Sequence, residues 1–284
     1  MCRQRTALLF VPGDRPDYFD KAAESQADTI IFDLEDAVAC SSKEESRVMV
    51  EQALEERSFG SRELSVRINP LSTPWGLKDL EMIRRCPAVN VILLPKAEPG
   101  SVKRVSEALE KESFLILCLI ETAIGLQQAY ETAKASTLVD GLMLGAEDLA
   151  AELNLERTAE GTEIQYARQV LVLAANAAGV QPIDTPFLRI GDLDSLAEDA
   201  ANARKMGFTA KAALSPRQVP VIRKAFFPDS EEIKKAKIIV EAAEQAELQG
   251  RGIVIIDGAM VDQPVVIKAR RVLDLAGEGN LNDC

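Results

Sequence analysis

Eight short apolar runs alternate with amphipathic stretches along most of this 284-residue chain. Apolar runs of this length, bounded by turn-forming residues, are typical of buried strands, and the stretches between them have helical spacing. Strands that alternate with helices predict parallel βαβ units, and eight of them favour an α/β fold closed as a (β/α)8 TIM barrel over an open sheet. The predicted strands are Thr6–Val11, Thr29–Leu34, Leu64–Ile68, Val91–Leu94, Leu115–Ile120, Gly141–Leu144, Gln181–Asp184 and Phe208–Ala212.

The helices predicted between these runs carry several end signals. Asp14 precedes the first helix as a possible N-cap, and Ser42 with Glu45 has the spacing of a capping box. Gly179 and Gly207 follow two later helices, at the position where a left-handed residue ends a helix. The predicted helices are Arg15–Ser25, Ser42–Leu54, Gly76–Arg84, Ser101–Glu110, Gly125–Ala135, Glu163–Ala178 and Leu193–Met206.

The regular alternation stops before the C-terminal segment. We expect a barrel domain at 1–228 and a C-terminal helical extension at 229–284, with a frayed end from Gly277. The extension is too small to bury a core of its own, so it must pack on the barrel or on a neighbouring subunit. Its predicted elements are a helix Glu231–Leu248 after the start signal Pro228-Asp229-Ser230, a strand-like run Ile253–Asp257 and a last helix Pro264–Leu275.

Composition excludes several classes of partner and catalyst. The formal net charge of −12 argues against nucleic acid as a main partner, because phosphate backbones are bound by basic surfaces. The chain has no histidine, which excludes Ser-His-Asp and Cys-His catalysis and zinc sites built on histidine. Acid–base chemistry is therefore left to Asp, Glu, Lys, Tyr, Cys or metal-bound water.

The cysteines and the apolar segments bear on the compartment. The five cysteines are odd in number and widely scattered, and no two of them form a CxxC motif. This pattern predicts reduced thiols. The N-terminal segment lacks the long apolar stretch of a signal peptide. No run approaches the roughly 18 apolar residues that cross a membrane. We therefore expect a cytoplasmic protein with no membrane partner.

Two carboxylates follow apolar runs at the carboxyl ends of predicted strands. Glu121 comes directly after the fifth run, and Asp148 follows the sixth by a short turn. The strands of a parallel barrel end at one mouth, and acids gathered there repel one another unless a cation lies between them. One Glu and one Asp completed by water and substrate oxygens is a usual arrangement for Mg²⁺. The alternative is that each caps a helix, as Asp148 would for a short Leu149–Leu153 helix; their joint occurrence at two strand ends favours the metal site.

Arg67 ends the third predicted strand, beside the acidic segment FDLED. Its guanidinium group could bind a substrate carboxylate through two hydrogen bonds. Alternatively it pairs with Asp33, Glu35 or Asp36 to neutralise an acidic rim, and both roles can hold together. We interpret these three acids as outer residues that orient the metal site, although one of them could touch the metal directly.

Three further charged residues are candidates with plainer alternatives. Lys96, after the fourth strand, could form a Schiff base if its pKa were lowered, but a protonated Lys96 bound to carboxylates is favoured among so many acids. Arg15 lies at a glycine turn that precedes a helix, which is a reasonable anion site or only a turn with an exposed arginine. Asp262 lies in a polar loop before Pro264 and has the position of an N-cap.

The same segments resemble the citrate lyase β-subunit family, the citryl-CoA lyase-like branch of the HpcH/HpaI aldolase superfamily. They occur in family order over nearly the whole chain, which makes the resemblance highly specific. The matching segments are LLFVPGDRP, IIFDLEDAV, VRINP followed by WGLKDLE, LLPKAE, LIETAIG, GLMLGAEDL, EGTEIQYAR, AAGVQPIDT, GFTAKAALSPRQV and DGAMVDQPVV.

The resemblance implies a Mg²⁺-dependent enzyme that cleaves or forms a carbon–carbon bond in a CoA or acyl-carrier thioester, with a 2-oxo acid as the other reactant. It implies that Glu121 and Asp148 bind the metal and that Arg67 binds the substrate carboxylate. It implies that Asp262 is the acid–base residue, delivered by the tail of a neighbouring subunit. The family is typically trimeric or a multiple of trimers, so the resemblance also implies a homo-oligomer.

One position departs from many stand-alone members of the family. Those members carry a histidine in the segment that reads KAALSPRQ in this chain, where Ser215 stands instead. Citrate lyase β-chains also tend to lack that histidine. Three outcomes stay open. The chain could be a lyase for citramalyl-, malyl- or citryl-CoA, a thioesterase or malate-synthase-like enzyme with the same site, or a subunit that works only inside a citrate lyase complex.

Overall fold

The structure of the chain is a computed structural model that describes residues 5–109, 114–158, 160–249, 253–256 and 258–277. The chain divides into two compact units, residues 1–223 and 224–284. The division falls inside helix α10 (Gln218–Phe226), slightly before the boundary at residue 228 expected from the sequence.

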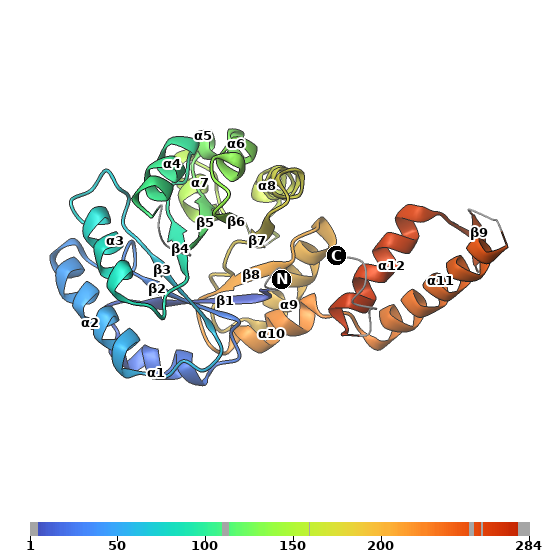
Figure 1. Cartoon of the computed structure of the whole chain (residues 1–284), viewed down its shortest axis with the longest axis horizontal. Coiled ribbons are helices and arrows are strands. Elements are labelled where there is room, and N and C mark those ends of the chain that lie inside the picture. The colour runs from blue at the N-terminus through green and yellow to red at the C-terminus, as the bar shows by residue number, and fades with distance from the viewer. Residues whose placement is uncertain (1–4, 110–113, 159, 250–252, 257, 278–284) are drawn as a thin grey trace. The chain divides into compact units, whose positions relative to one another are not determined.

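The larger unit is a closed barrel of eight parallel strands with helices around it (Figure 1). The first strand pairs with both the second and the eighth, which closes the sheet. Every predicted strand is present, so the prediction of a (β/α)8 barrel is confirmed. The strands are β1 (Ala7–Pro12), β2 (Thr29–Asp33), β3 (Glu63–Arg67), β4 (Val91–Leu94), β5 (Leu115–Ile120), β6 (Val139–Leu144), β7 (Gln181–Asp184) and β8 (Ala210–Ala213).

The helices of the barrel unit follow the strands in sequence. Two short helical turns, Cys40–Ser42 and Thr162–Ile164, precede α2 and α8. Gly179 and Gly207 adopt left-handed conformations at helix ends, as predicted. The helices are α1 (Pro16–Glu24), α2 (Lys43–Glu56), α3 (Gly76–Arg85), α4 (Pro99–Ala108), α5 (Ala123–Gln127), α6 (Ala129–Lys134), α7 (Ala146–Glu152), α8 (Gln165–Ala178), α9 (Leu193–Met206) and α10.

Several sequence-based helix predictions were wrong in detail. Arg15, and not Asp14, occupies the N-cap of α1, and Ser42 makes no side-chain capping bond at α2. The helix expected at Gly125–Ala135 is two short helices, α5 and α6, which meet at Gln128. Glu110, the expected end of α4, lies outside the described residues.

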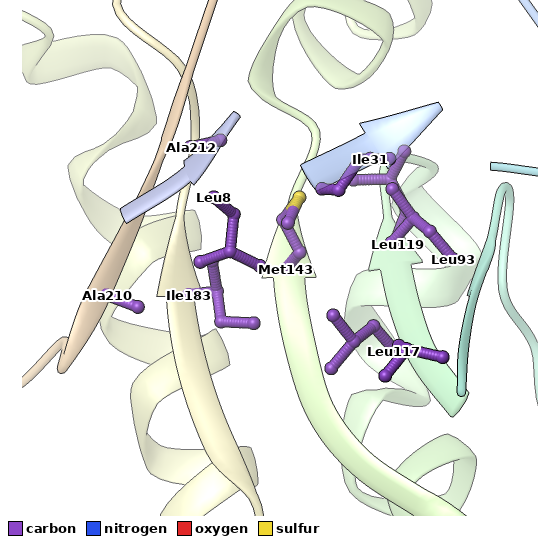
Figure 2. Close-up of a cluster of buried hydrophobic side chains, with 10 residues drawn as sticks. Leu8, Ile31, Leu93, Leu117, Leu119, Met143, Ile183, Ala210 and Ala212 are labelled. Atoms are coloured by element: carbon purple, nitrogen blue, oxygen red, sulfur yellow. The ribbon is translucent and has the colours of Figure 1, made fainter. Parts of the chain in front are cut away.

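Side chains from most strands meet inside the barrel and fill it (Figure 2). Successive side chains of a strand point to opposite faces, so Leu117 and Leu119 of β5 face inward together. The interior cluster consists of Leu8, Ile31, Val91, Leu93, Leu117, Leu119, Met143, Ile183, Ala210 and Ala212. The barrel is therefore a packed core and not a channel.

The amino-terminal end of the barrel is closed by a buried ionic cluster. Arg5, which is 2% exposed, forms ion pairs with Glu63 of β3 and with Asp140. Thr29 also donates a hydrogen bond to Glu63, at 2.9 Å. Polar groups at this end of a (β/α)8 barrel contribute to stability, whereas the chemistry of such barrels lies at the carboxyl ends of the strands.

The smaller unit pairs two helices with a β-hairpin. Asp229 and Glu232 form a capping box at the start of the first helix, so the predicted start signal is correct. Three buried residues, Ala236, Ala269 and Leu273, form its small core. The second strand of the hairpin was not predicted from the sequence. Asp257, the expected end of the first strand, lies outside the described residues. The elements are α11 (Ser230–Leu248), β9 (Val254–Ile256), β10 (Ala259–Val261) and α12 (Gln263–Leu275).

Candidate active site at the mouth of the barrel

A pocket of about 420 Å³ opens at the carboxyl ends of the barrel strands. Its wall comes from the last residues of the strands and from the loops that follow them, which is where barrel enzymes place their chemistry. Four of the charged residues predicted from the sequence lie in this wall together: Asp33, Arg67, Glu121 and Asp148. The lining includes Phe10, Pro12, Asp33, Arg67, Leu119, Glu121, Met143, Glu147, Asp148, Thr185 and Leu214.

Glu121 follows β5 directly and is 2% exposed. Its Oε1 accepts a hydrogen bond from the backbone amide of Lys96 at 2.8 Å. The adjacent helix α5 is capped by Thr122, whose hydroxyl accepts from the amide of Gly125 at 3.0 Å. The alternative in which Glu121 caps a helix is therefore wrong, and its carboxylate is directed to the pocket instead.

Asp148 lies in the first turn of α7, after the N-cap Gly145. It does not cap a Leu149–Leu153 helix, because α7 begins before it at Ala146. Asp148 makes no hydrogen bond or ion pair with any other residue in the described part of the chain. A carboxylate that lines a pocket without a protein partner is available to a ligand.

The donor set fits a hard divalent cation. Burial, together with the nearby negative charges of Glu35 and Asp148, raises the pKa of Glu121 to about 8, against a lowering by the hydrogen bond from the Lys96 amide. Among the described residues no group of three or more His, Cys, Asp or Glu is arranged to hold a metal ion. Mg²⁺ suits such a site because it usually binds one or two carboxylates and takes its other ligands from water and substrate oxygens.

Gly145 leaves the space that the Glu121 side chain occupies. A Cβ atom at residue 145 would lie 2.5 Å from Glu121 Cβ and 2.8 Å from its Oε2. We expect Gly145→Ala to displace the carboxylate and to lower activity at least about 100-fold, because small displacements of catalytic groups have effects of this size. Gly100→Ala is the matched control, since a Cβ there meets no atom within 4 Å. Equal kcat/KM in both variants would contradict the placement of Glu121.

Arg67 lies at the end of β3 among three carboxylates. Its Nε donates to Asp33 Oδ1 at 2.7 Å and its Nη2 to Asp33 Oδ2 at 2.5 Å. Its Nη1 lies 3.0 Å from Glu35 Oε2 and donates to Asp36 Oδ2 at 3.2 Å. The guanidinium group also lies over the ring of Phe10, 5.4 Å from its centre. The pairing alternative is thus present, and it fixes Arg67 at the pocket wall.

Glu35 and Lys96 link Arg67 to Glu121. Strand β2 ends at Asp33, so Glu35 lies in the bend that follows the strand and not on one of its faces. Lys96 Nζ donates to Glu35 Oε1 at 3.3 Å, and its backbone adopts φ of 45°, which directs its amide to Glu121. Burial lowers the pKa of Lys96, but Glu35 and Glu121 raise it by more, so the net shift is upward. A protonated lysine bound to carboxylates fits this site better than a Schiff-base lysine.

The pH dependence of stability follows from the two buried acids. Burial raises the pKa of Glu121 to about 8 and that of Glu35 to about 7, from ordinary values of 4.5. A carboxyl group with a raised folded-state pKa stabilises the fold below its unfolded pKa, and this contribution is lost as pH rises through the folded value. Urea denaturation of the metal-free protein should therefore show a falling free energy of unfolding between about pH 5 and about pH 8. A rise over this range without Mg²⁺ would contradict it.

Arg15 does not line the mouth pocket among the residues that the structure describes there. It forms an ion pair with Asp17 at 3.1 Å and lies 4.2 Å from the centre of the Tyr18 ring. Tyr18 itself does line the pocket. Arg15 is therefore at the outer side of this wall, where it meets solvent.

Asp262 belongs to the smaller unit and has the local geometry predicted from its sequence. It is the N-cap of α12, and its Oδ1 accepts from the amide of Val265 at 3.4 Å. Pro264 follows in the first turn. A catalytic role for Asp262 remains a prediction.

A second buried ionic cluster borders the mouth pocket and was missed from the sequence. Lys211 Nζ, on β8, lies 2.6 Å from Asp184 Oδ2 on β7 and donates to the carbonyl of Thr185 at 2.7 Å. Arg168 of α8 donates to both oxygens of Asp184 at 2.9 Å, and Asp199 completes the cluster. The available signal was Lys211 inside a strand of alanines, together with Asp184 at the end of the preceding strand.

Comparison with known proteins places the chain in a family. Residues 6–216 match the family described as HpcH/HpaI aldolase/citrate lyase. The chain belongs to this family. Its members include the citrate lyase β chains that the sequence resembles, so that resemblance is confirmed.

Relatives match over nearly the full length of the chain. The citrate lyase subunit beta of Leuconostoc mesenteroides subsp. cremoris is 36% identical over 291 residues, 99% of this chain and 96% of the relative. The (3S)-malyl-CoA thioesterase of Cereibacter sphaeroides is 33% identical over 268 residues, 94% and 93% of the two chains. The crystal structure of CitE from Mycobacterium tuberculosis, in complex with magnesium, acetoacetate and coenzyme A, matches with a TM-score of 0.84 and 34% identity. The match covers 98% of this chain and 100% of the CitE chain.

Membership in the citrate lyase family bears on the remaining expectations. The citrate lyase relatives indicate a lyase, as expected. The magnesium bound by CitE of Mycobacterium tuberculosis agrees with the Mg²⁺ cofactor predicted from the sequence. Within the described ranges, no helix has the length and apolar character needed to cross a membrane.

Proposed function

We propose that this chain is a Mg²⁺-dependent lyase that cleaves a 3-hydroxyacyl-CoA thioester to acetyl-CoA and a 2-oxo acid. The observation that carries the proposal is the pair Glu121 and Asp148, two carboxylates without capping roles that line one pocket at the barrel mouth. The family of the chain supports the reaction class.

The residues of the mouth would divide the work as follows. Glu121 and Asp148 would hold Mg²⁺, which when bound supplies Lewis-acid stabilisation of charge on the substrate oxygens. Arg67 would bind the substrate carboxylate through the guanidinium N–H groups that Asp33, Glu35 and Asp36 do not engage. Transfer of the hydroxyl proton to one of the acids of the FDLED segment, with cleavage of the bond between C2 and C3 of the thioester, then yields the 2-oxo acid and the enolate of acetyl-CoA.

Asp262 would protonate that enolate carbon, or remove a proton from the methyl group in the reverse direction. The proposal that a neighbouring copy supplies Asp262 rests on the family resemblance and on the place of this residue in a separate, smaller unit. The hydrophobic cluster described in that unit contains three buried residues, which is a small core and suits a segment that packs on another subunit. A trimer or a multiple of trimers is the proposed assembly.

Two further outcomes have support from named relatives. The malyl-CoA thioesterase relative favours water attack on the thioester, which would release an intact hydroxy acid. The citrate lyase β-subunit relative favours action inside a complex, on a thioester of an acyl-carrier protein. Pyruvate, oxaloacetate and glyoxylate are the 2-oxo acids that the candidate substrates would yield.

Product analysis with citramalyl-, malyl- and citryl-CoA separates these outcomes. Release of acetyl-CoA by the purified chain alone would support the stand-alone lyase and rank the substrates. Free CoA with an intact hydroxy acid would identify hydrolysis. Cleavage only of an acyl-carrier thioester, and only with partner proteins present, would identify the subunit of a complex and contradict the stand-alone lyase.

A further inference from the structure

A second pocket, of about 220 Å³, lies in the barrel unit next to the mouth pocket. The two pockets share Thr185 and Pro186, which follow β7. The second pocket is lined by three arginines, Arg157, Arg168 and Arg189, to which the proposed function gives no role. This concentration of guanidinium groups is notable in a chain with a net charge of −12.

Arg168 is buried and held from one side. Its side chain is 3% exposed, its Nε and Nη2 donate to Asp184 at 2.9 Å, and Nη2 also donates to Asp199 at 2.8 Å. Its Nη1 has no hydrogen-bond or ion-pair partner among the described residues and points toward Gly161, another lining residue. Nη1 is not one of the fully buried polar atoms that lack a partner, so it is open to the pocket and can donate to a ligand there.

Arg157 and Arg189 are anchored in the same manner. Arg157 Nε donates to Glu147 at 2.9 Å and its Nη1 pairs with Glu163. Arg189 Nε lies 3.2 Å from Asp192. Each keeps at least one terminal nitrogen without a partner in the described structure. Carboxylates therefore orient all three guanidinium groups and leave donors for a ligand.

The rest of the lining is suited to an organic group. The guanidinium of Arg189 lies 5.1 Å from the centre of the Phe187 ring, which holds the ring beside the arginines. Ile164, Pro186 and Leu188 complete an apolar side. Asp199 is the single acid among the described residues of the lining, and it forms ion pairs with Lys211 and Arg168.

We propose that this pocket is a phosphate-binding subsite for a phosphate group carried by an organic molecule. A phosphate group offers several acceptor oxygens, and the planar guanidinium group of arginine binds phosphate through two parallel hydrogen bonds. The phosphate could belong to the nucleotide end of the CoA thioester, a source that rests on the proposed function, or to a separate phosphorylated ligand.

Arg157→Gln and Arg189→Gln test the site, because both side chains are partly exposed and lie outside the cluster of Arg168 with Asp184. The probes are adenosine 3′,5′-bisphosphate and inorganic phosphate, measured by calorimetry on the full metal-free chain. We expect binding by the wild type and a loss of about tenfold or more in each variant, the effect of one charged hydrogen bond.

Arg85→Gln is the matched control for these variants. Arg85 is an exposed arginine on α3 that is ion-paired with Glu51 at 2.7 Å and lines neither pocket. It should bind both probes as the wild type does. Failure of both probes to bind the wild type, or equal affinity in the wild type and the two variants, would overturn the proposal.

Kinetics on two thioesters distinguish the sources of the phosphate. If the nucleotide end of CoA occupies the site, Arg157→Gln and Arg189→Gln raise KM for the CoA thioester but not for the pantetheine thioester, which lacks the nucleotide. If both KM values stay unchanged while probe binding falls, a separate phosphorylated ligand uses the site. Should no thioester be cleaved at all, arginine-dependent binding of the bisphosphate would still support the subsite, and the proposed function alone would fail.

Discussion

Replacement of Glu121 or Asp148 by alanine should abolish Mg²⁺-dependent turnover, with a fall in kcat/KM of more than about 1,000-fold. The reason is that the two carboxylates are the proposed protein ligands of the cation, and no third acid completes a cage among the described residues. Each variant should also lose Mg²⁺ binding measured by calorimetry without substrate. Glu121→Gln should behave as Glu121→Ala does, since it keeps the shape of the side chain and removes the charge.

A matched control separates metal binding from charge near a helix end. Asp194 occupies the first turn of α9 much as Asp148 occupies that of α7, but it is exposed and does not line the mouth pocket. Asp194→Asn should keep Mg²⁺ affinity and turnover. Retained Mg²⁺-dependent turnover in both Glu121→Ala and Asp148→Ala would remove the basis of the proposed site.

Asp262→Asn should lower turnover at least about 100-fold, as expected for a lost general acid–base group, while binding of the 2-oxo acid stays normal. The amide cannot exchange a proton with the enolate carbon, but it can still accept the bond from the Val265 amide that caps α12. Binding of pyruvate, oxaloacetate or glyoxylate with Mg²⁺ should be measured beside kcat. Weakened oxo-acid binding with intact turnover would refute the assigned role.

Mixed oligomers test whether a neighbouring copy delivers Asp262. Asp262→Asn and Glu121→Ala chains are each expected to be inactive, but co-assembled chains should regain activity, because an intact barrel then meets an intact Asp262 from another copy. Asp274→Asn, on the same helix α12, is the control and should be as active as the wild type. An inactive mixture of chains that do co-assemble would show that Asp262 acts in its own chain or not at all.

The strands could be predicted because their apolar runs are short, bounded and repeated, as in Val91–Leu94 and Leu115–Ile120, which match the structure to the residue. Helix ends were harder, because a local capping pattern competes with tertiary contacts. Ser42 has capping-box spacing but is the last residue of a short helical turn and makes no capping bond. Helix α7 has seven residues, too few to show a helical period in sequence.

The candidate site was predictable where a charge follows an apolar run. Glu121 and Asp148 satisfied that condition, and the structure brings them to one pocket. Arg168 and Lys211 did not, because alternation along a strand or helix makes a single charge look solvent-facing. Their burial depends on partners from β7 and α9, which are distant in sequence and come together only in the folded barrel. The pairing of Arg67 with three acids was likewise one of two open alternatives until the fold placed them together.

The most direct test of the proposed lyase is the product ratio from a 3-hydroxyacyl-CoA thioester with the purified chain, measured with Mg²⁺ and again with a chelator. We expect equal amounts of acetyl-CoA and 2-oxo acid with Mg²⁺, and neither product with the chelator. Cleavage that persists in the chelator, or release of an intact hydroxy acid with free CoA, would contradict a metal-dependent carbon–carbon lyase at the barrel mouth.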